Sequence, residues 1–178
     1  NKLPNPNDAN FSQIFNEKIK ICNCIFNFNN AQKQINGKRS KLNALIEIHD
    51  VLSRKGYAQL LTSKQKDLIM DMISKNIFEQ DPFISHIKVY ETIPKLCFIE
   101  RSWEHLSHIY KILNQFVLLF PEKFNIVHVK KAIRLMNIPD VNERENLATF
   151  LKNYTKVHTE HFDEIWKKMK NVLTDVRF

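Results

Sequence analysis

The clearest pattern in this chain is the spacing of apolar residues in the segment 102–120. One stripe recurs at steps of three and four residues, as on one face of an α-helix, and comprises Trp103, Leu106, Tyr110, Leu113, Val117 and Phe120. A second stripe beside it comprises Ile109, Ile112, Phe116 and Leu119. Because a helix that buries one face needs only one stripe, we expect neighbours to cover this helix on two sides. Ser102 is the predicted N-cap, and Pro121 ends the segment.

Helical spacing recurs in seven other segments, at about 10–27, 39–55, 62–77, 83–93, 125–136, 143–157 and 160–176. The chain holds only two glycines, a residue that sheets and tight hairpins use at their turns, so the pattern predicts an all-α fold. Helices joined in series form either a closed bundle or an open α-solenoid. The last segment is strongly apolar and no polar capping repeat follows it, which favours a solenoid cut from a longer array.

Local signals refine these segments. Thr62 and Gln65 match a capping box, and Gly56 follows the second segment where a left-handed backbone suits glycine. We expect 29–38, with Gly37, to be a polar connection. The expected inner face of the second helix holds Leu42, Leu45, Ile46, either Ile48 or His49, and Leu52. In the last helix, the residues expected to pack on Leu147, Leu151 and Tyr154 are Phe162, Trp166, Met169 and Leu173.

The net charge of +8 raises the question of nucleic-acid binding. The basic residues are scattered in ones and twos without an aromatic-interleaved patch, so nucleic acid is not an expected partner. No segment approaches the roughly 18–20 apolar residues that cross a bilayer, so no membrane contact is expected. Cys22, Cys24 and Cys97 lack metal-ligand spacing, which favours reduced thiols and a location in the cytoplasm, with the nucleus as a further compartment.

The sequence shows no pattern for catalysis, and we expect no cofactor. Gly37 and Gly56 stand alone, so no glycine-rich loop is present to hold phosphate. His158 and His161 stand three apart and could share a metal ion, but we interpret them as part of a solvated helix junction because no third spaced ligand is supplied. The remaining candidates are interpreted as surface residues, His105 and His108, or as core and near-core packing groups, Cys22 and Cys24.

The run 140–145 supports two interpretations. It can be a connection feeding a helix whose acidic first turn offsets the helix dipole. It can also be a charged loop between repeats that contacts a partner, since such loops are common docking positions. The partner-binding candidates in this run are Asp140, Asn142, Glu143, Arg144 and Glu145.

Three stretches together resemble the B-prime class of protein phosphatase 2A regulatory subunits. An aromatic-x-His-Leu-x-x-x-Tyr pattern of that family is matched by Trp103, His105, Leu106 and Tyr110. The family's acidic loop and the leucine after it are matched by the segment 140–147. The pattern of its first helix is matched by Lys20, Cys22, Ile25, Phe26 and Phe28. The resemblance extends over residues 11–178 in order and in register.

The resemblance implies an α-solenoid of HEAT-like antiparallel helix hairpins. Residues 10–178 would be the N-terminal part of the repeat domain, while the polar composition of residues 1–9, with Pro4 and Pro6, predicts a mobile lead-in. The resemblance also implies a non-catalytic subunit that joins a phosphatase scaffold subunit and a Ser/Thr phosphatase catalytic subunit, and that recruits substrates through short linear motifs. The positions that match the family's motif groove are Lys152, Asn153, Thr155 and Phe162. Of the family's basic and tyrosine side chains there, only the positive charge at Lys152 is kept.

Two functions follow for testing. The first is a regulatory, substrate-targeting subunit of a protein phosphatase 2A type holoenzyme. The alternative is a free-standing helical-repeat adaptor or a basic nucleic-acid-binding solenoid that shares the fold alone, because a fold does not determine a function.

Overall fold

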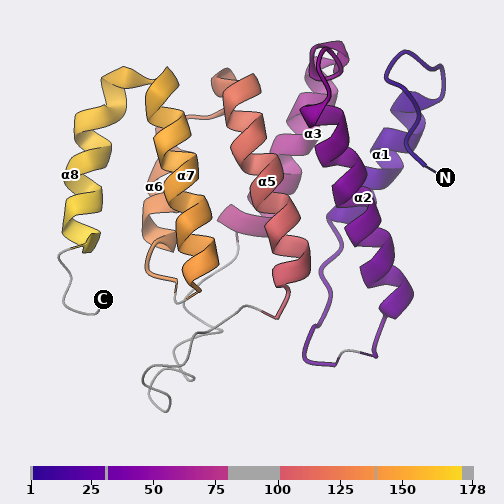
Figure 1. Ribbon diagram of the computed structural model, residues 1–178, viewed down its shortest axis with the longest axis horizontal. Coiled ribbons are helices and arrows are strands. Elements are labelled where there is room, and N and C mark those ends of the chain that lie inside the picture. The colour runs from indigo at the N-terminus through magenta and orange to yellow at the C-terminus, as the bar shows by residue number, and fades with distance from the viewer. Residues whose placement is uncertain (1, 31, 80–100, 139, 174–178) are drawn as a thin grey trace.

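The chain forms a row of helices set side by side, with α1 at one end and α8 at the other (Figure 1). The computed structural model describes residues 2–30, 32–79, 101–138 and 140–173, with side chains described up to residue 170. No strand occurs within these ranges, which confirms the predicted all-α fold. None of the helices in the same ranges is long and apolar enough to span a membrane.

The α-helices of the described residues are α1 (Phe11–Cys22), α2 (Ile35–Ser53), α3 (Ser63–Ile73), α5 (Trp103–Leu119), α6 (Ile126–Leu135), α7 (Val141–Val157) and α8 (Phe162–Leu173). A π-helical turn, Ser74–Phe78, continues α3. Turns of 3₁₀ helix occupy Ala58–Leu60, Pro121–Lys123 and Thr159–His161. The helix predicted between Pro82 and Pro94 lies outside the described residues.

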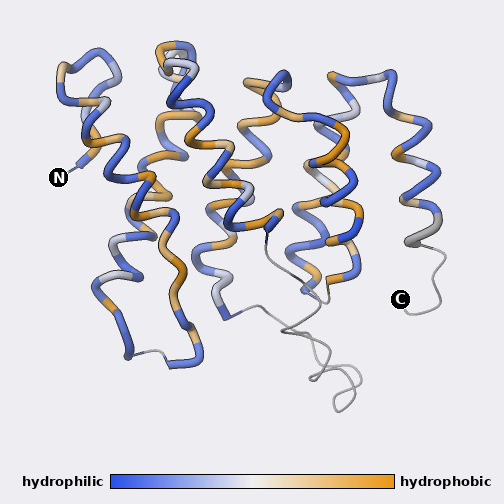
Figure 2. Tube along the Cα trace, turned by 180° about the vertical axis from the view of Figure 1, so that it is seen from behind, coloured by the Kyte–Doolittle hydropathy of each residue, from blue (hydrophilic) through white to orange (hydrophobic). Residues whose placement is uncertain are grey.

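The helices form two layers. In the first layer α5 packs between α2 and α7. In the second layer α1 contacts α3, the π-helical turn after α3 contacts α6, and α6 contacts α8. Helix pairs α1–α2, α3–α5 and α6–α7 connect the layers, as α-solenoid hairpins do. Apolar and polar positions alternate along each helix, so that each helix has an apolar side for its neighbours (Figure 2).

The central helix α5 confirms the first prediction. Ile109, Ile112 and Phe116 of one stripe and Tyr110, Leu113 and Val117 of the other are all buried. The helix therefore has covered faces on two sides, toward α2 and α7. It ends at Leu119, two residues before Pro121. Ser102 precedes the helix as predicted, but its side chain makes no capping hydrogen bond to it.

The predicted capping box of α3 and the predicted left-handed glycine after α2 are both present, although α2 ends at Ser53, three residues before Gly56. Thr62 Oγ1 accepts the Gln65 backbone N–H at 3.3 Å, and Gln65 Oε1 accepts the Thr62 N–H at 2.8 Å. These two bonds satisfy backbone donors that a helix start otherwise leaves unpaired. Gly56 has a φ of 84°, the left-handed backbone that glycine adopts without strain.

The first hairpin differs from the prediction. α1 ends at Cys22 rather than near residue 27, and α2 begins at Ile35, so Gly37 lies inside a helix instead of in a connection. A Cβ atom at Gly37 would lie 2.7 Å from Cε1 of Phe26, which explains a glycine in this helical position. The buried face of α2 is also rotated, since it includes Lys41 while Ile46 is 36% exposed.

The last helix buries a different face from the predicted one. Ile165 is 3% exposed, whereas Phe162 and Trp166 are 52% and 56% exposed. The prediction that Phe162 and Trp166 pack inward is therefore wrong. The reason is that α8 lies in the second layer, against α6, and this placement turns Ile165 and the partly buried Met169 toward the core.

The lead-in contacts the folded helices. The Leu3 backbone N–H donates to Glu47 Oε2 at 2.7 Å, and Asn5 Nδ2 donates to the Tyr57 hydroxyl at 2.8 Å. Leu3 packs against the core. The predicted boundary at residue 9, and the mobility of the segment before it, stay predictions.

Candidate functional site

The acidic turn 140–145 holds two buried carboxylates, one that caps its own helix and one that bonds to α5. Asp140 caps α7 by accepting the backbone N–H groups of Asn142 and Glu143 at 2.8 and 3.4 Å. Glu143 accepts the Tyr110 O–H at 2.7 Å, so α7 is fixed to α5 by a buried hydrogen bond. Burial, followed by the Glu143 carboxylate, raises the pKa of Tyr110 well above its ordinary value.

The other residues of the turn are more accessible. Arg144 Nη1 donates to the Ile138 carbonyl oxygen at 2.7 Å and, like Asn142, is partly buried. Glu145 is exposed. The structure thus gives Asp140 and Glu143 the helix-start role of the first interpretation. Partner binding by the turn stays a prediction, and Glu145 is the residue most open to a partner.

The four positions that match the motif groove lie on α7 and at the start of α8. Lys152 and Phe162 are exposed, whereas Asn153 is buried. The Thr155 hydroxyl donates within its own helix, to the carbonyl oxygens of Leu151 and Lys152, each at 3.0 Å. Of the four side chains, those of Lys152 and Phe162 are therefore open to solvent, and peptide binding at these positions stays a prediction.

A buried lysine network was not predicted from the sequence. Lys41, 4% exposed, donates through Nζ to Asn76 Oδ1 at 2.7 Å and to the Cys24 carbonyl oxygen at 2.8 Å. Asn76 donates in turn to the Cys22 carbonyl oxygen at 3.3 Å. Burial lowers the pKa of Lys41 to about 8 and raises the pKa of the Cys22 thiol to about 12. The network joins the end of α1 to α2 and to the turn after α3.

His105 is a second buried polar residue, and its interpretation as a surface residue was wrong. Its Nε2–H donates to the Lys38 carbonyl oxygen at 2.9 Å, and its ring lies edge-on to Phe28, with centroids 4.9 Å apart. Burial lowers the pKa of His105. Its burial could have been inferred from its place four residues before Ile109, which puts both residues on the same buried face of the helix. In the same way, Lys41 stands four residues before the buried Leu45. Cys24 is exposed, contrary to its predicted near-core position.

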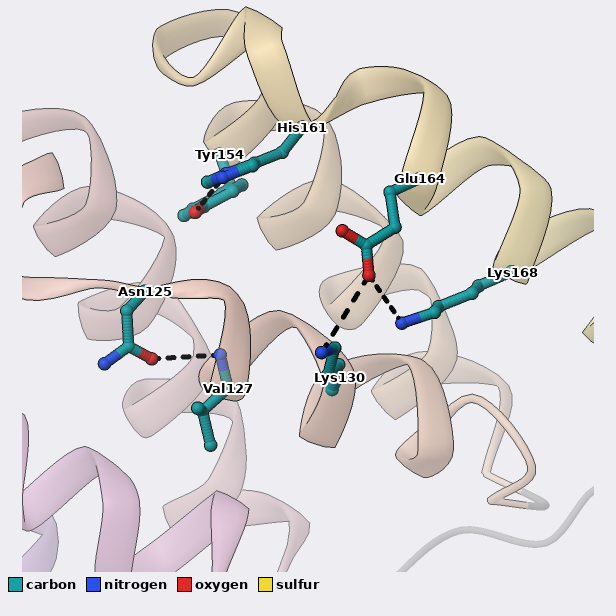
Figure 3. Close-up of polar contacts among 7 residues, drawn as sticks. All are labelled: Asn125, Val127, Lys130, Tyr154, His161, Glu164 and Lys168. Atoms are coloured by element: carbon teal, nitrogen blue, oxygen red, sulfur yellow. Dashed lines mark hydrogen bonds and ion pairs between the residues drawn. The ribbon is translucent and has the colours of Figure 1, made fainter.

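The corner between α7 and α8 brings several titratable side chains together. The Tyr154 hydroxyl and His161 Nδ1 point toward one another and lie 2.8 Å apart (Figure 3). His158 Nδ1 lies 3.3 Å from Glu160 Oε1. Within the described part of the chain, one trio of possible metal ligands has its donor atoms within 4.8 Å of one another, namely His158, Glu160 and His161. Glu160 is the third member of this trio, and the sequence analysis did not count it as a possible ligand.

Next to this corner, an exposed ion pair links α8 to α6. Glu164 Oε1 lies 2.7 Å from Lys168 Nζ on its own helix and 3.9 Å from Lys130 Nζ on α6 (Figure 3). The start of α6 is capped by Asn125, whose Oδ1 accepts the Val127 N–H at 3.0 Å (Figure 3). The cap therefore stabilises the start of α6, and the ion pair adds a contact between α6 and α8.

Comparison with known proteins gives a family match over the whole length. The profile of the family described as "Protein phosphatase 2A regulatory B subunit (B56 family)" matches residues 1–178. A similar protein from Arabidopsis thaliana is the gamma isoform of a 59 kDa B' regulatory subunit of serine/threonine protein phosphatase 2A. It is 28% identical over 96% of this chain and 35% of its own length.

Fungal relatives agree. A 56 kDa regulatory subunit delta 2 isoform from Schizosaccharomyces pombe is 24% identical over 96% of this chain and 29% of its own length. A 56 kDa regulatory subunit delta isoform from Saccharomyces cerevisiae is 25% identical over 84% of this chain and 21% of its own length. The chain therefore spans only about a fifth to a third of the length of these three relatives.

Proposed function

Since this chain belongs to the B56 family of protein phosphatase 2A regulatory B subunits, we propose that it is a non-catalytic subunit that joins a scaffold subunit and a Ser/Thr phosphatase catalytic subunit. The observation that carries the proposal is the family match over residues 1–178. The two-layer stack supports it, because stacked helix pairs offer long surfaces on which large partners can dock. A location in the cytoplasm and the nucleus belongs to the same proposal.

Substrate recruitment is the second part of the proposal. Short linear motifs would lie along α7 and the start of α8, where Lys152 and Phe162 are exposed. The Lys152 ammonium would pair with an acidic motif residue, and the Phe162 ring would contact an apolar one. Because Asn153 is buried, we expect it to support the groove rather than to contact the peptide.

Co-purification from the native cell tests the function. The protein, tagged at its own gene, is captured with and without nuclease, and the bound proteins are identified by mass spectrometry. Recovery of a phosphatase scaffold and catalytic subunit in both samples is the expected result. The proposal would be refuted if neither sample contained a phosphatase subunit. If, in addition, the captured proteins were lost after nuclease treatment, the nucleic-acid-binding alternative would be favoured.

A charge reversal on the acidic turn tests where the partner docks. Glu145→Lys should lower recovery of the phosphatase subunits several-fold, because like charges then oppose at a docking surface, and should leave the melting temperature unchanged. Glu17→Lys, an equal reversal at an exposed position of α1, is the matched control and should change neither quantity. Equal recovery with Glu145→Lys and Glu17→Lys would exclude Glu145 from the interface.

Glu143→Lys cannot serve in that experiment. As one of the partner-binding candidates of the sequence, Glu143 would be expected to give a docking variant, Glu143→Lys, that leaves the isolated chain stable. The structure contradicts that expectation, because Glu143 is buried and accepts the Tyr110 O–H. A lysine there would place a second donor and an unpaired charge beside Tyr110, so loss of partner binding would follow from unfolding.

A further inference from the structure

We propose that the corner between α7 and α8 binds a divalent transition-metal ion such as Zn²⁺ through His158, Glu160 and His161. This site is independent of the phosphatase role proposed above. Two imidazoles and one carboxylate are a ligand set that zinc uses in proteins, with a fourth position left for water. Their donor atoms already lie within 4.8 Å of one another.

Two of the three donor-atom separations involve Glu160, and both are close to those around a small ion. Ligands about 2.1 Å from a tetrahedral zinc ion lie roughly 3.4 Å from one another. The separation between His158 Nδ1 and Glu160 Oε1 is 3.3 Å, which matches that value. The separation between Glu160 Oε1 and His161 Nδ1 is 4.0 Å, so this pair must close by about half an ångström. The Glu160 side chain is 62% exposed and can rotate to close it.

The ring of His158 presents the correct nitrogen. Its Nε2 lies 3.3 Å from the Pro121 carbonyl oxygen, an atom that can only accept a hydrogen bond. With an ion at Nδ1, which faces Glu160, the hydrogen of the neutral ring would sit on Nε2 and point to this carbonyl oxygen. A ligating histidine whose other nitrogen donates to a backbone carbonyl is the usual outer arrangement of protein metal sites.

Tyr154 fixes the position of both imidazoles. Its ring is fully buried and stacks on His158 and on His161, with centroid separations of 4.5 and 5.8 Å. Both rings are thus in contact with the buried tyrosine before any ion binds, which reduces the entropy that binding must cost. The Tyr154 hydroxyl lies 2.8 Å from His161 Nδ1, so an ion at this nitrogen replaces that hydrogen bond.

Charge also favours a cation at Glu160 rather than at the next carboxylate. Glu164 is already paired with Lys130 and Lys168. Within the described residues, the ion pairs of Glu160 are with His158 and His161 alone, and these add no positive charge when the rings are neutral. Glu160 therefore has no lysine or arginine that a metal ion would have to displace. Because His158 follows α7 and His161 precedes α8, the ion would join the two helices at their connection.

Zinc titration of the purified chain tests the site. The exposed thiol of Cys24 and the thiol of Cys97 are first replaced by serine, so that thiolate binding cannot contribute. Isothermal calorimetry with Zn²⁺ alone should then give one ion per chain, with a dissociation constant on the order of micromolar. The melting temperature should rise with Zn²⁺, since an ion that binds only the folded state stabilises it.

Two variants and one control locate the ligands. Glu160→Gln should weaken zinc binding at least tenfold, and the double variant His158→Gln, His161→Gln should abolish it. Glu164→Gln removes a carboxylate one helical turn away and should leave the affinity unchanged. Circular dichroism without zinc checks that each variant is folded. Absence of zinc binding to the serine-substituted chain, or equal affinity in Glu160→Gln and Glu164→Gln, would overturn the proposal.

Discussion

Lys41 places an ammonium group among the apolar side chains between α1, α2 and the turn after α3. Its pKa of about 8 lies below the ordinary 10.5, so between these values the unfolded chain binds more protons than the folded one. Stability from this residue therefore rises as the pH rises from 8 toward 10.5. Cys22 acts in the opposite direction, because its thiol loses a proton near pH 9.0 when unfolded and near 12 when folded.

The free energy of unfolding should consequently rise by about 1 kcal/mol between pH 8 and 9, and then level off or fall. Urea denaturation at half-unit pH steps measures this profile. Lys41→Met should remove the rise, and Cys22→Ala should let the rise continue above pH 9. A rise of the same size in Lys41→Met would show that Lys41 is not its source.

Single buried polar residues are also where sequence reasoning reached its limit. The capping box at Thr62 and Gln65 was predictable because both partners lie within one turn of helix. The roles of Lys41 and His105 were not, because their partners, Asn76 and the Lys38 carbonyl oxygen, are 35 and 67 residues away. The sequence did show a polar residue at a position on an apolar stripe in each case. Such a residue indicates burial, but it does not identify the hydrogen-bond partner.

At the scale of the element, α8 shows how apolar spacing can leave the buried face undetermined. Phe162, Ile165, Trp166 and Met169 satisfy helical spacing in either of two orientations. The layer in which the helix lies decides between them, and the second layer buries Ile165. For α5 the buried face was not ambiguous, because both of its apolar stripes are covered, and the prediction for this helix was confirmed.

Alanine substitution distinguishes the two faces of α8. Ile165→Ala should lower the free energy of unfolding by about 2–4 kcal/mol, because it empties a buried position. Trp166→Ala should cost less than about 1 kcal/mol, since its side chain is 56% exposed. Equilibrium urea unfolding measures both. The reverse order of the two losses would mean that α8 packs with the face that the sequence first suggested.

Gly37 gives a second test at this scale. Alanine in a helix interior is favoured over glycine by about 1 kcal/mol, yet a Cβ here would lie 2.7 Å from the Phe26 ring. Gly37→Ala should therefore destabilise the wild-type chain. In a Phe26→Ala background the same substitution should stabilise by about 1 kcal/mol. Additive effects in this double-mutant cycle would show that the Phe26 ring does not occupy the space beside Gly37.

At the scale of the whole molecule, stability depends on contacts between neighbouring helices. α5 is covered by α2 and α7, and also contacts α3, whereas α8 packs chiefly against α6 and the turn before it. In such stacks each unit is stabilised by its own neighbours, so stability is expected to differ along the row. The family and the fold class were predictable because they depend on repeated spacing, while the layer of each helix depends on contacts that no local pattern encodes.

Amide hydrogen exchange followed by mass spectrometry should reveal this gradient. Amides of α5 between residues 109 and 117 should exchange slowest, and those of α8 fastest among the helices of the described ranges. Exchange of α5 and α8 at one common rate, after correction for sequence, would instead indicate a single cooperative unit.

In the π-helical turn Ser74–Phe78, the number of residues matters as much as which residues they are. Each residue of an α-helix turns the chain by about 100°, so one extra residue within a turn resets the phase of everything after it. This phase directs Phe78 toward Phe150, with ring centroids 6.0 Å apart, and toward His128, at 5.7 Å. A deletion of one residue here would swing Phe78 away from both rings, and should be tolerated far less well than a conservative replacement of any residue in the turn.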